Sequence, residues 1–276
     1  MKNLKKLSLL AASALLAVAF LAAGCGSDSA SSGSSSKNTT VTVGATPVPH
    51  GEILNEIKPL LAKEGVDLKV VEFTDYVKPN LALNDKELDA NFFQHSPYLD
   101  KFNSEHGTKL KAIAKIHVEP MGIYSRKIKD LKDLADGAKV AIPNDPTNGG
   151  RALLILQSAG LITLKDGGNI TSTVQDVVKN DKNLQFVELD AAQIPRSLDD
   201  TDLACVNTNY AIPAGLNPQK DSLLVESKDS PYANVLVVRQ GDENNETYKK
   251  VLAIYQSEPI KKFIEDHFQG TILPAF

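Results

Sequence analysis

From residue 41 onward, short apolar runs alternate with segments whose apolar residues recur every three or four positions. The strand-like runs are Val41–Ala45, Leu68–Phe73, Lys111–His117, Gly122–Ser125, Lys139–Ile142, Leu184–Leu189, Leu203–Asn207 and Val235–Arg239. The helix-like segments are Gly51–Lys63, Leu81–Leu88, Pro97–His106, Arg151–Ala159, Thr173–Lys179 and Thr247–Phe268, the last as one helix or a pair. Strands that alternate with helices are typical of an α/β fold with mainly parallel sheets.

The N-terminal segment has the pattern of a lipoprotein signal peptide. Three lysines precede an apolar run from Leu7 to Ala23, and the small residues that follow end at Cys25. A transmembrane helix is the alternative, but the run is short, rich in alanine and followed by no cluster of charges that would stop transfer. We therefore predict that residues 1–24 are removed and that Cys25 is lipidated.

A serine-rich segment separates this cysteine from the first predicted strand. Residues 26–40 contain seven serines and no large apolar side chain. Such a segment cannot bury enough surface to offset its ordering entropy. We predict that residues 25–40 form a lipidated tether, which would hold the folded part on the extracytoplasmic face of a cell membrane.

Charge and cysteine content narrow the class of protein further. The whole chain has a net charge of −4, and the predicted leader contains lysines but no acidic residue. A mildly acidic domain is poorly suited to nucleic acid, whose binding requires clustered lysine and arginine. Besides Cys25 only Cys205 is present, so no internal disulfide is expected and this thiol should be buried in packing.

No enzyme motif is apparent in the sequence, and we predict a binding protein without a cofactor. The phosphate-binding loop, the dinucleotide fingerprint and the nucleophile elbow are all missing. The five histidines show no metal-ligand spacing. A dispersed metal site built from His50, His95, His117 and an acidic residue remains an alternative, since distant ligands leave no local signal.

The loop before Arg151 has the pattern of an anion site. A predicted strand ends at Ile142, and the following turn is rich in proline, asparagine and glycine, with Asn148 as a candidate helix cap. Free N–H groups at a helix start attract anions, and an arginine in the first turn can grip a carboxylate with two bonds. The alternative is that Arg151 pairs with an acidic residue of the protein itself, and the sequence does not decide between them.

Aromatic residues and asparagines supply the other candidate pocket groups. Five of the sixteen phenylalanines and tyrosines lie in two predicted loops, 73–76 and 91–98. Tyr76, His95 and Tyr98 lie among turn residues, which favours a pocket wall over the core. Asn207 follows one predicted strand and Asn234 precedes another, and strand ends are where α/β sheets bind ligands. Either asparagine could equally be a turn cap.

These stretches together resemble the NlpA/MetQ family of methionine-binding lipoproteins. The matching segments are DYVKPN at 75–80, LDANFFQH at 88–95, VAIPNDPTN at 140–148, PRSLDD at 195–200, VNTNYA at 206–211 and SPYAN at 230–234. They occur in the family's order over nearly all of residues 40–276. One departure is the loop at 44–51, GATPVPHG, where the family commonly has Gly-Pro-His-Ala after its threonine.

The resemblance implies a two-lobed periplasmic-binding-protein fold (type II-like) with a hinge of two crossover segments. Lobe 1 would comprise residues 41–125 plus 236–276, and lobe 2 residues 126–235. The implied ligand is methionine, and the implied site residues are Tyr76, Phe93, His95 and Tyr98 around the thioether, Arg151 on the carboxylate, and Asn207 and Asn234 on the amino and carboxylate groups.

The implied partners are an ABC permease with its ATPase subunit, and the membrane through the lipid anchor. A methionine-containing dipeptide or another amino acid is the nearest alternative ligand. Alternatives from other classes are a metal-capture lipoprotein and a surface adhesin.

Overall fold

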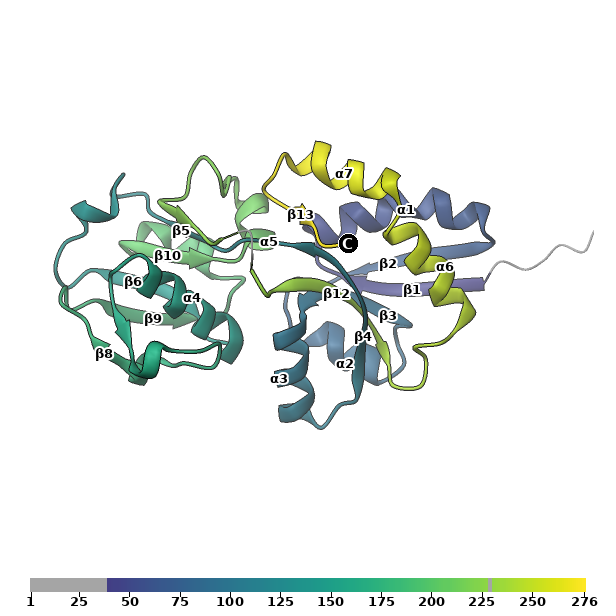
Figure 1. Ribbon diagram of the computed structural model, residues 1–276, viewed down its shortest axis with the longest axis horizontal. Coiled ribbons are helices and arrows are strands. Elements are labelled where there is room, and N and C mark those ends of the chain that lie inside the picture. Colours follow the sequence, from purple (N-terminus) through teal and green to yellow (C-terminus); the bar gives the residue numbers. More distant parts are fainter. Residues whose placement is uncertain (1–38, 228–229) are drawn as a thin grey trace, which may run out of the picture. The chain divides into compact units, whose positions relative to one another are not determined.

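Two β-sheets, each covered by helices, form two lobes (Figure 1). The structure is a computed structural model that describes residues 39–227 and 230–276. The predicted signal peptide, Cys25 and residues 25–38 of the predicted tether lie outside this range. Within the described range, no helix combines the length and the apolar character needed to cross a membrane.

Lobe 1 is built on a mixed six-stranded sheet in the order β13–β4–β12–β3–β1–β2. Its strands are β1 (Thr39–Ala45), β2 (Val66–Glu72), β3 (Ala90–His95), β4 (Leu110–Val118), β12 (Ala233–Arg239) and β13 (Leu273–Pro274). Its helices are η1 (Pro47–Gly51), α1 (Glu52–Lys63), α2 (Lys78–Asn84), α3 (Ser96–His106), α6 (Glu246–Tyr255) and α7 (Glu258–Phe268).

Lobe 2 is built on a five-stranded sheet in the order β11–β5–β10–β6–β9. Its strands are β5 (Gly122–Tyr124), β6 (Lys139–Pro143), β9 (Gln185–Leu189), β10 (Leu203–Val206) and β11 (Leu224–Val225), with a separate pair β7 (Thr163–Leu164) and β8 (Val177–Lys179). Its helices are η2 (Leu131–Asp133), α4 (Pro146–Ser158), η3 (Lys165–Gly167), η4 (Val174–Asp176), η5 (Ile194–Asp199), α5 (Thr208–Ala211) and η6 (Ile212–Ala214).

Each sheet has a hydrophobic core on both faces. In β12 the side chains alternate as strand geometry requires: Val235 and Val237 pack toward α2 and α3, while Leu236 and Val238 pack toward α1, α6 and α7. In lobe 2, α4 covers one face, and Cys205 lies buried and free in that core, as predicted. The two-lobed α/β fold is thereby confirmed, with three layers in each lobe.

The chain crosses between the lobes after β4 and again before β12, which differs from the predicted boundaries by a few residues. β5 pairs with β10 in the lobe 2 sheet, although residues 122–125 were assigned to lobe 1. β12 begins at Ala233 and pairs with β3 and β4, although residues 233–235 were assigned to lobe 2. The sheets are also mixed rather than mainly parallel, because β5 and β12 enter them in the reverse direction.

Several local predictions were wrong for identifiable reasons. The predicted helix at 173–179 is instead η4 followed by β8, where Val177 pairs with Leu164 of β7. The predicted loop over residues 91–95 is the central strand β3. The polar side chains of Asn91 and Gln94, which suggested a turn, are buried and hydrogen-bonded to Asn80 at 2.8 and 2.6 Å. Helix α2 begins at Lys78, three residues before its predicted start.

Candidate functional site

All seven predicted site residues line one pocket between the lobes. Its lining consists of the predicted Tyr76, Phe93, His95, Tyr98, Arg151, Asn207 and Asn234, together with Gln94, Glu119, Asn148, Thr208 and Asn209. The structure therefore brings the candidates together from both lobes, while their role in binding stays a prediction.

The aromatic candidates form one wall of the pocket. Phe93 and Tyr98 are buried and pack with Phe102 and with the half-buried Tyr76. The ring centroid of Tyr76 lies 6.0 Å from that of Phe93 and 5.8 Å from that of Tyr98. The Tyr98 hydroxyl donates to the backbone oxygen of Tyr76 at 2.9 Å, which fixes the two rings relative to each other. Burial raises the pKa of both phenols, so the wall is uncharged.

His95 links this wall to lobe 2. It ends β3, and its Nδ1 accepts from the backbone N–H of Tyr98 at 3.1 Å, which caps α3. The proton must then lie on Nε2, which donates to Asn148 Oδ1 of lobe 2 at 3.1 Å. Burial and the nearby Arg151 charge lower the pKa of His95 to about 3, so the imidazole is neutral.

Three buried histidines make the free energy of unfolding depend on pH. Burial lowers the pKa from 6.5 to about 4 for His50 and to about 3 for His95 and His117. As pH falls, these histidines are protonated in the unfolded chain at a higher pH than in the folded protein. The free energy of unfolding is therefore at its full value above pH 6.5 and decreases as pH falls toward 4. We expect a loss of about 2 kcal/mol per histidine between pH 7 and pH 5.

Glu119 opposes this trend in part, because burial raises the pKa of its carboxyl group. Urea denaturation of the ligand-free protein at pH 7, 6 and 5 would measure the combined effect. The variant His95→Gln, which keeps an amide donor near Asn148, should remove about a third of the histidine contribution. A free energy of unfolding that stays constant over this range would contradict the burial of neutral histidines.

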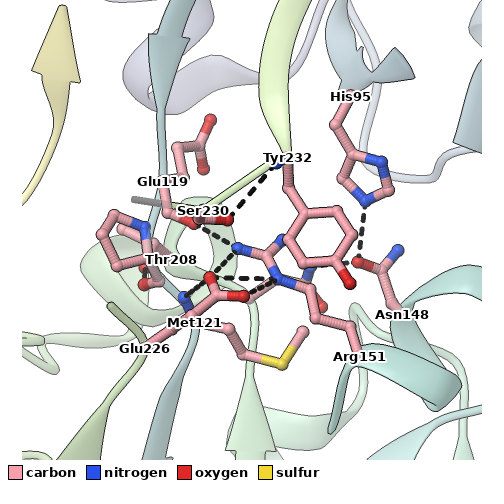
Figure 2. Close-up of polar contacts among 11 residues, drawn as sticks. His95, Glu119, Met121, Asn148, Arg151, Thr208, Glu226, Ser230 and Tyr232 are labelled. Carbon is pink, nitrogen blue, oxygen red and sulfur yellow. Dashed lines mark hydrogen bonds and ion pairs between the residues drawn. The ribbon is translucent and has the colours of Figure 1, made fainter. Parts of the chain in front are cut away.

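Arg151 has a more elaborate environment than the sequence suggested. Helix α4 begins at Pro146, so Arg151 lies in its second turn rather than the first. Figure 2 shows the guanidinium between the Glu226 carboxylate and the Tyr232 ring, with the ring centroid at 4.3 Å. Arg151 Nε donates to Glu226 Oε1 at 3.0 Å, and Nη2 donates to the same carboxylate and to the Glu119 backbone oxygen.

Both interpretations of Arg151 thus find support in the structure. The residue pairs with an acidic side chain of the protein, Glu226, and it also lines the pocket. Across the described residues, its third nitrogen, Nη1, has no hydrogen-bond partner. One edge of a buried guanidinium therefore remains free to bind an anion in the pocket.

Asn148 is a pocket residue that the sequence analysis assigned only as a helix cap. The cap is instead Asp145, whose carboxylate accepts from the Asn148 backbone N–H at 2.9 Å. The Asn148 side-chain amide also donates to Asp145, at 3.0 Å, which orients its oxygen toward His95 and Asn207. The asparagine three residues before Arg151, on the same helix face, was the available signal.

Two asparagines after β10 present unpaired polar atoms. Asn207 Nδ2 donates to Asn148 Oδ1 at 2.9 Å, whereas Asn207 Oδ1 is buried and has no partner in the described part of the chain. Asn209, which was not predicted, accepts from the Tyr76 hydroxyl at 2.5 Å, while no residue in 39–227 or 230–276 bonds to its buried Nδ2. Unsatisfied buried polar atoms are costly, and at a pocket wall they indicate a polar ligand. The pair offers one acceptor and one donor.

Asn234 lies inside β12 and connects to a buried histidine pair behind the pocket. Its Oδ1 lies 3.1 Å from His50 Nε2. The side-chain atoms of His50, His117 and Glu119 that could coordinate a metal lie within 4.8 Å of one another. Two histidines of the alternative metal site are thus close together, whereas His95 is bonded to Asn148 instead. Glu119 Oε1 lies 2.7 Å from His117 Nε2, so hydrogen bonding alone accounts for this closeness.

Two covered sheets with a pocket at the crossing between them define a two-lobed substrate-binding protein, a class of binding proteins rather than enzymes. Residues 41–276 match the family model described as NlpA lipoprotein, and the chain belongs to this family. The resemblance seen in the sequence motifs is confirmed.

Three similar proteins illustrate the relationship. The D-methionine-binding lipoprotein MetQ of Escherichia coli (strain K12) is 49% identical over 78% of this chain and 81% of its own. The probable D-methionine-binding lipoprotein MetQ of Pasteurella multocida (strain Pm70) is 42% identical over 98% of this chain and 100% of its own. A nutrient-binding protein from Burkholderia cenocepacia, whose structure was determined bound to methionine, aligns with a TM-score of 0.83 and 46% identity over 86% of this chain and 100% of its own.

Proposed function

We propose that this chain captures methionine in the pocket between its lobes and delivers it to an ABC permease. The observation that carries the proposal is a set of polar groups in the pocket that have no hydrogen-bond partner among the described residues: Arg151 Nη1, Asn209 Nδ2 and Asn207 Oδ1. Two donors and one acceptor beside an aromatic wall suit a zwitterion with an apolar side chain. The names of the relatives in E. coli and P. multocida support methionine as that ligand.

In the proposed complex, Arg151 Nη1 and Asn209 Nδ2 bind the methionine carboxylate. Asn207 Oδ1 accepts from the ammonium group, and Asn234 closes the polar end. The thioether lies against Tyr76, Phe93, His95 and Tyr98, since aromatic rings make favourable contacts with sulfur. Residues of both lobes contact the ligand, so binding stabilises the closed arrangement.

The closed arrangement is already held by direct bonds between the lobes. The Tyr76 hydroxyl donates to Asn209 at 2.5 Å, and the Tyr210 hydroxyl donates to the Thr74 backbone oxygen at 3.1 Å. We propose that a permease and its ATPase subunit accept this closed form. A lipid on Cys25 would keep the protein at the extracytoplasmic membrane surface, where that permease is reached without diffusion through the medium.

Calorimetry tests the ligand assignment. The chain from Cys25 to Phe276 is unfolded and refolded to remove co-purified ligand, then titrated separately with L-methionine, D-methionine and glycylmethionine. We expect one-to-one binding of at least one methionine enantiomer. Binding of the dipeptide alone would replace methionine with a dipeptide as the ligand. No heat with any of the three would contradict the assignment.

A further inference from the structure

Glu119, His50 and His117 form a buried cluster directly behind the pocket. His50 lies in η1 and His117 near the end of β4, and Glu119 follows β4 in the first crossing between the lobes. Both histidines are fully buried, and Glu119 is 6% exposed. The same carboxylate oxygen, Glu119 Oε1, lies 3.2 Å from His50 Nε2 and 2.7 Å from His117 Nε2.

The hydrogen-bond partners fix where the protons of this cluster lie. His50 Nε2 faces two acceptors, Glu119 Oε1 and Asn234 Oδ1, so it must carry the proton. His50 Nδ1 then accepts from the Thr46 hydroxyl at 2.7 Å. His117 Nε2 likewise donates to Glu119. Burial lowers the pKa of His50 to about 4 and that of His117 to about 3, so both donors are neutral imidazoles.

Glu119 consequently receives N–H groups but no full positive charge. These groups are the Nε2–H of His50 and the Nε2–H of His117. Burial raises the pKa of this carboxyl group, and the N–H donors offset that effect only in part. The Arg151 guanidinium contacts only the Glu119 backbone oxygen and directs its charge to Glu226. Among the described residues, no lysine or arginine forms an ion pair with Glu119.

An ionised carboxylate buried without a cation is costly, and Glu119 lines the binding pocket. The lining of this pocket also includes Asn209 and Arg151, the two residues proposed to bind the ligand carboxylate. A ligand ammonium group would therefore find two acceptors in the lining of the same pocket, the Glu119 carboxylate and Asn207 Oδ1, which has no partner among the described residues. A positive ligand group would also supply the charge that the cluster lacks.

We infer that Glu119 binds the ammonium group of the ligand and that His50 and His117 are positioning residues that hold its carboxylate in place at the pocket. This inference rests on the proposed methionine-binding function and specifies the ligand class further. The ligand must carry a free amino group as well as a free carboxylate. Acids without the amino group, and N-acylated amino acids, should bind poorly.

A cycle of protein and ligand changes tests the pairing. Calorimetry compares L-methionine, or D-methionine if that enantiomer binds tighter, with 4-(methylsulfanyl)butanoic acid, which lacks only the amino group. In the unmodified protein, removing the amino group should weaken binding at least about 30-fold. In Glu119→Gln, methionine should lose about the same factor, whereas the acid without the amino group should bind as well as before or better.

Two substitutions of His117 separate positioning from general damage. His117→Leu removes the N–H donor, so methionine should weaken by about tenfold while the acid without the amino group changes little. His117→Gln keeps an amide donor and should restore most of the methionine affinity. His267→Gln, at an exposed histidine bonded to Glu52, is the matched control and should change neither ligand. If Glu119→Gln does not fold, the comparison of His117→Leu with His117→Gln still tests the inference.

The outcomes distinguish the inference from the proposed function. Equal weakening of both ligands by Glu119→Gln, or by His117→Leu, would overturn the inference and leave methionine binding intact. No methionine binding by the unmodified protein would overturn both. A Zn²⁺ titration of the ligand-free protein provides a further check, because one-to-one zinc binding that is lost in His117→Leu would make the cluster a metal site and overturn the ammonium role.

Discussion

Replacing Arg151 with alanine is expected to weaken methionine binding by at least about 100-fold, or about 3 kcal/mol. The substitution removes Nη1, the one Arg151 guanidinium nitrogen that has no hydrogen-bond partner among the described residues, and with it the charge that faces the ligand carboxylate. It also leaves the Glu226 carboxylate, whose side chain is 12% exposed, without its cation. A fall in the free energy of unfolding of about 3 kcal/mol should therefore accompany the loss of affinity.

A double variant separates these two effects. In Arg151→Ala combined with Glu226→Gln, the unpaired carboxylate is gone, so most of the stability should return while the affinity stays low. Arg126→Ala is the matched control, because Arg126 forms an exposed ion pair with Asp199 and lies outside the pocket lining. If the double variant regained methionine affinity together with stability, Arg151 would be a structural ion-pair partner and not a ligand-binding residue.

Gly150→Ala is expected to reduce both stability and binding, although alanine normally favours a helix. An added Cβ at this position would lie 2.1 Å from the backbone oxygen of Ile170, a contact that only backbone movement can relieve. We expect a loss of about 3 kcal/mol in the free energy of unfolding. Since Asn148 and Arg151 flank this glycine on α4, displacement of the helix should also weaken methionine binding by about tenfold or more.

Gly51→Ala is the matched control for this prediction. Gly51 has helical dihedral angles, φ −63° and ψ −37°, and an added Cβ would meet its nearest atom at 3.4 Å. The same substitution there should leave stability unchanged or raise it by up to about 1 kcal/mol. Chemical denaturation and calorimetry measure both variants. Equal stability of Gly150→Ala and Gly51→Ala would show that α4 tolerates a side chain against residues 170–172.

The elements of this fold differ in how far neighbouring residues alone specify them. The terminal helix pair was recognised because α6 and α7 each repeat apolar residues with helical spacing over three turns. Strand β3 was assigned to a loop because its Asn91 and Gln94 are polar, whereas hydrogen bonds to each other and to Asn80 make their burial favourable. A polar residue that is buried with a partner is indistinguishable in sequence from one that is exposed.

The same contrast applies to the site. The seven predicted site residues could be identified from local motifs, because the strand ends and turns that contain them have recognisable sequences. Tertiary structure alone decided that Arg151 is paired with Glu226, 75 residues away, and that one of its nitrogens remains free. It also decided that Asn209 and Glu119 join the pocket.

By itself, the sequence determined the alternation of strands and helices, the family and the residues that could form a polar and aromatic pocket. These properties depend on local periodicity and on short motifs, which neighbouring residues specify. Only the tertiary structure decided the mixed direction of the sheets, the crossings at the lobe boundary and the convergence of His50, His117 and Glu119. Such features depend on contacts between distant segments, whose geometry is set by the packing of the whole chain.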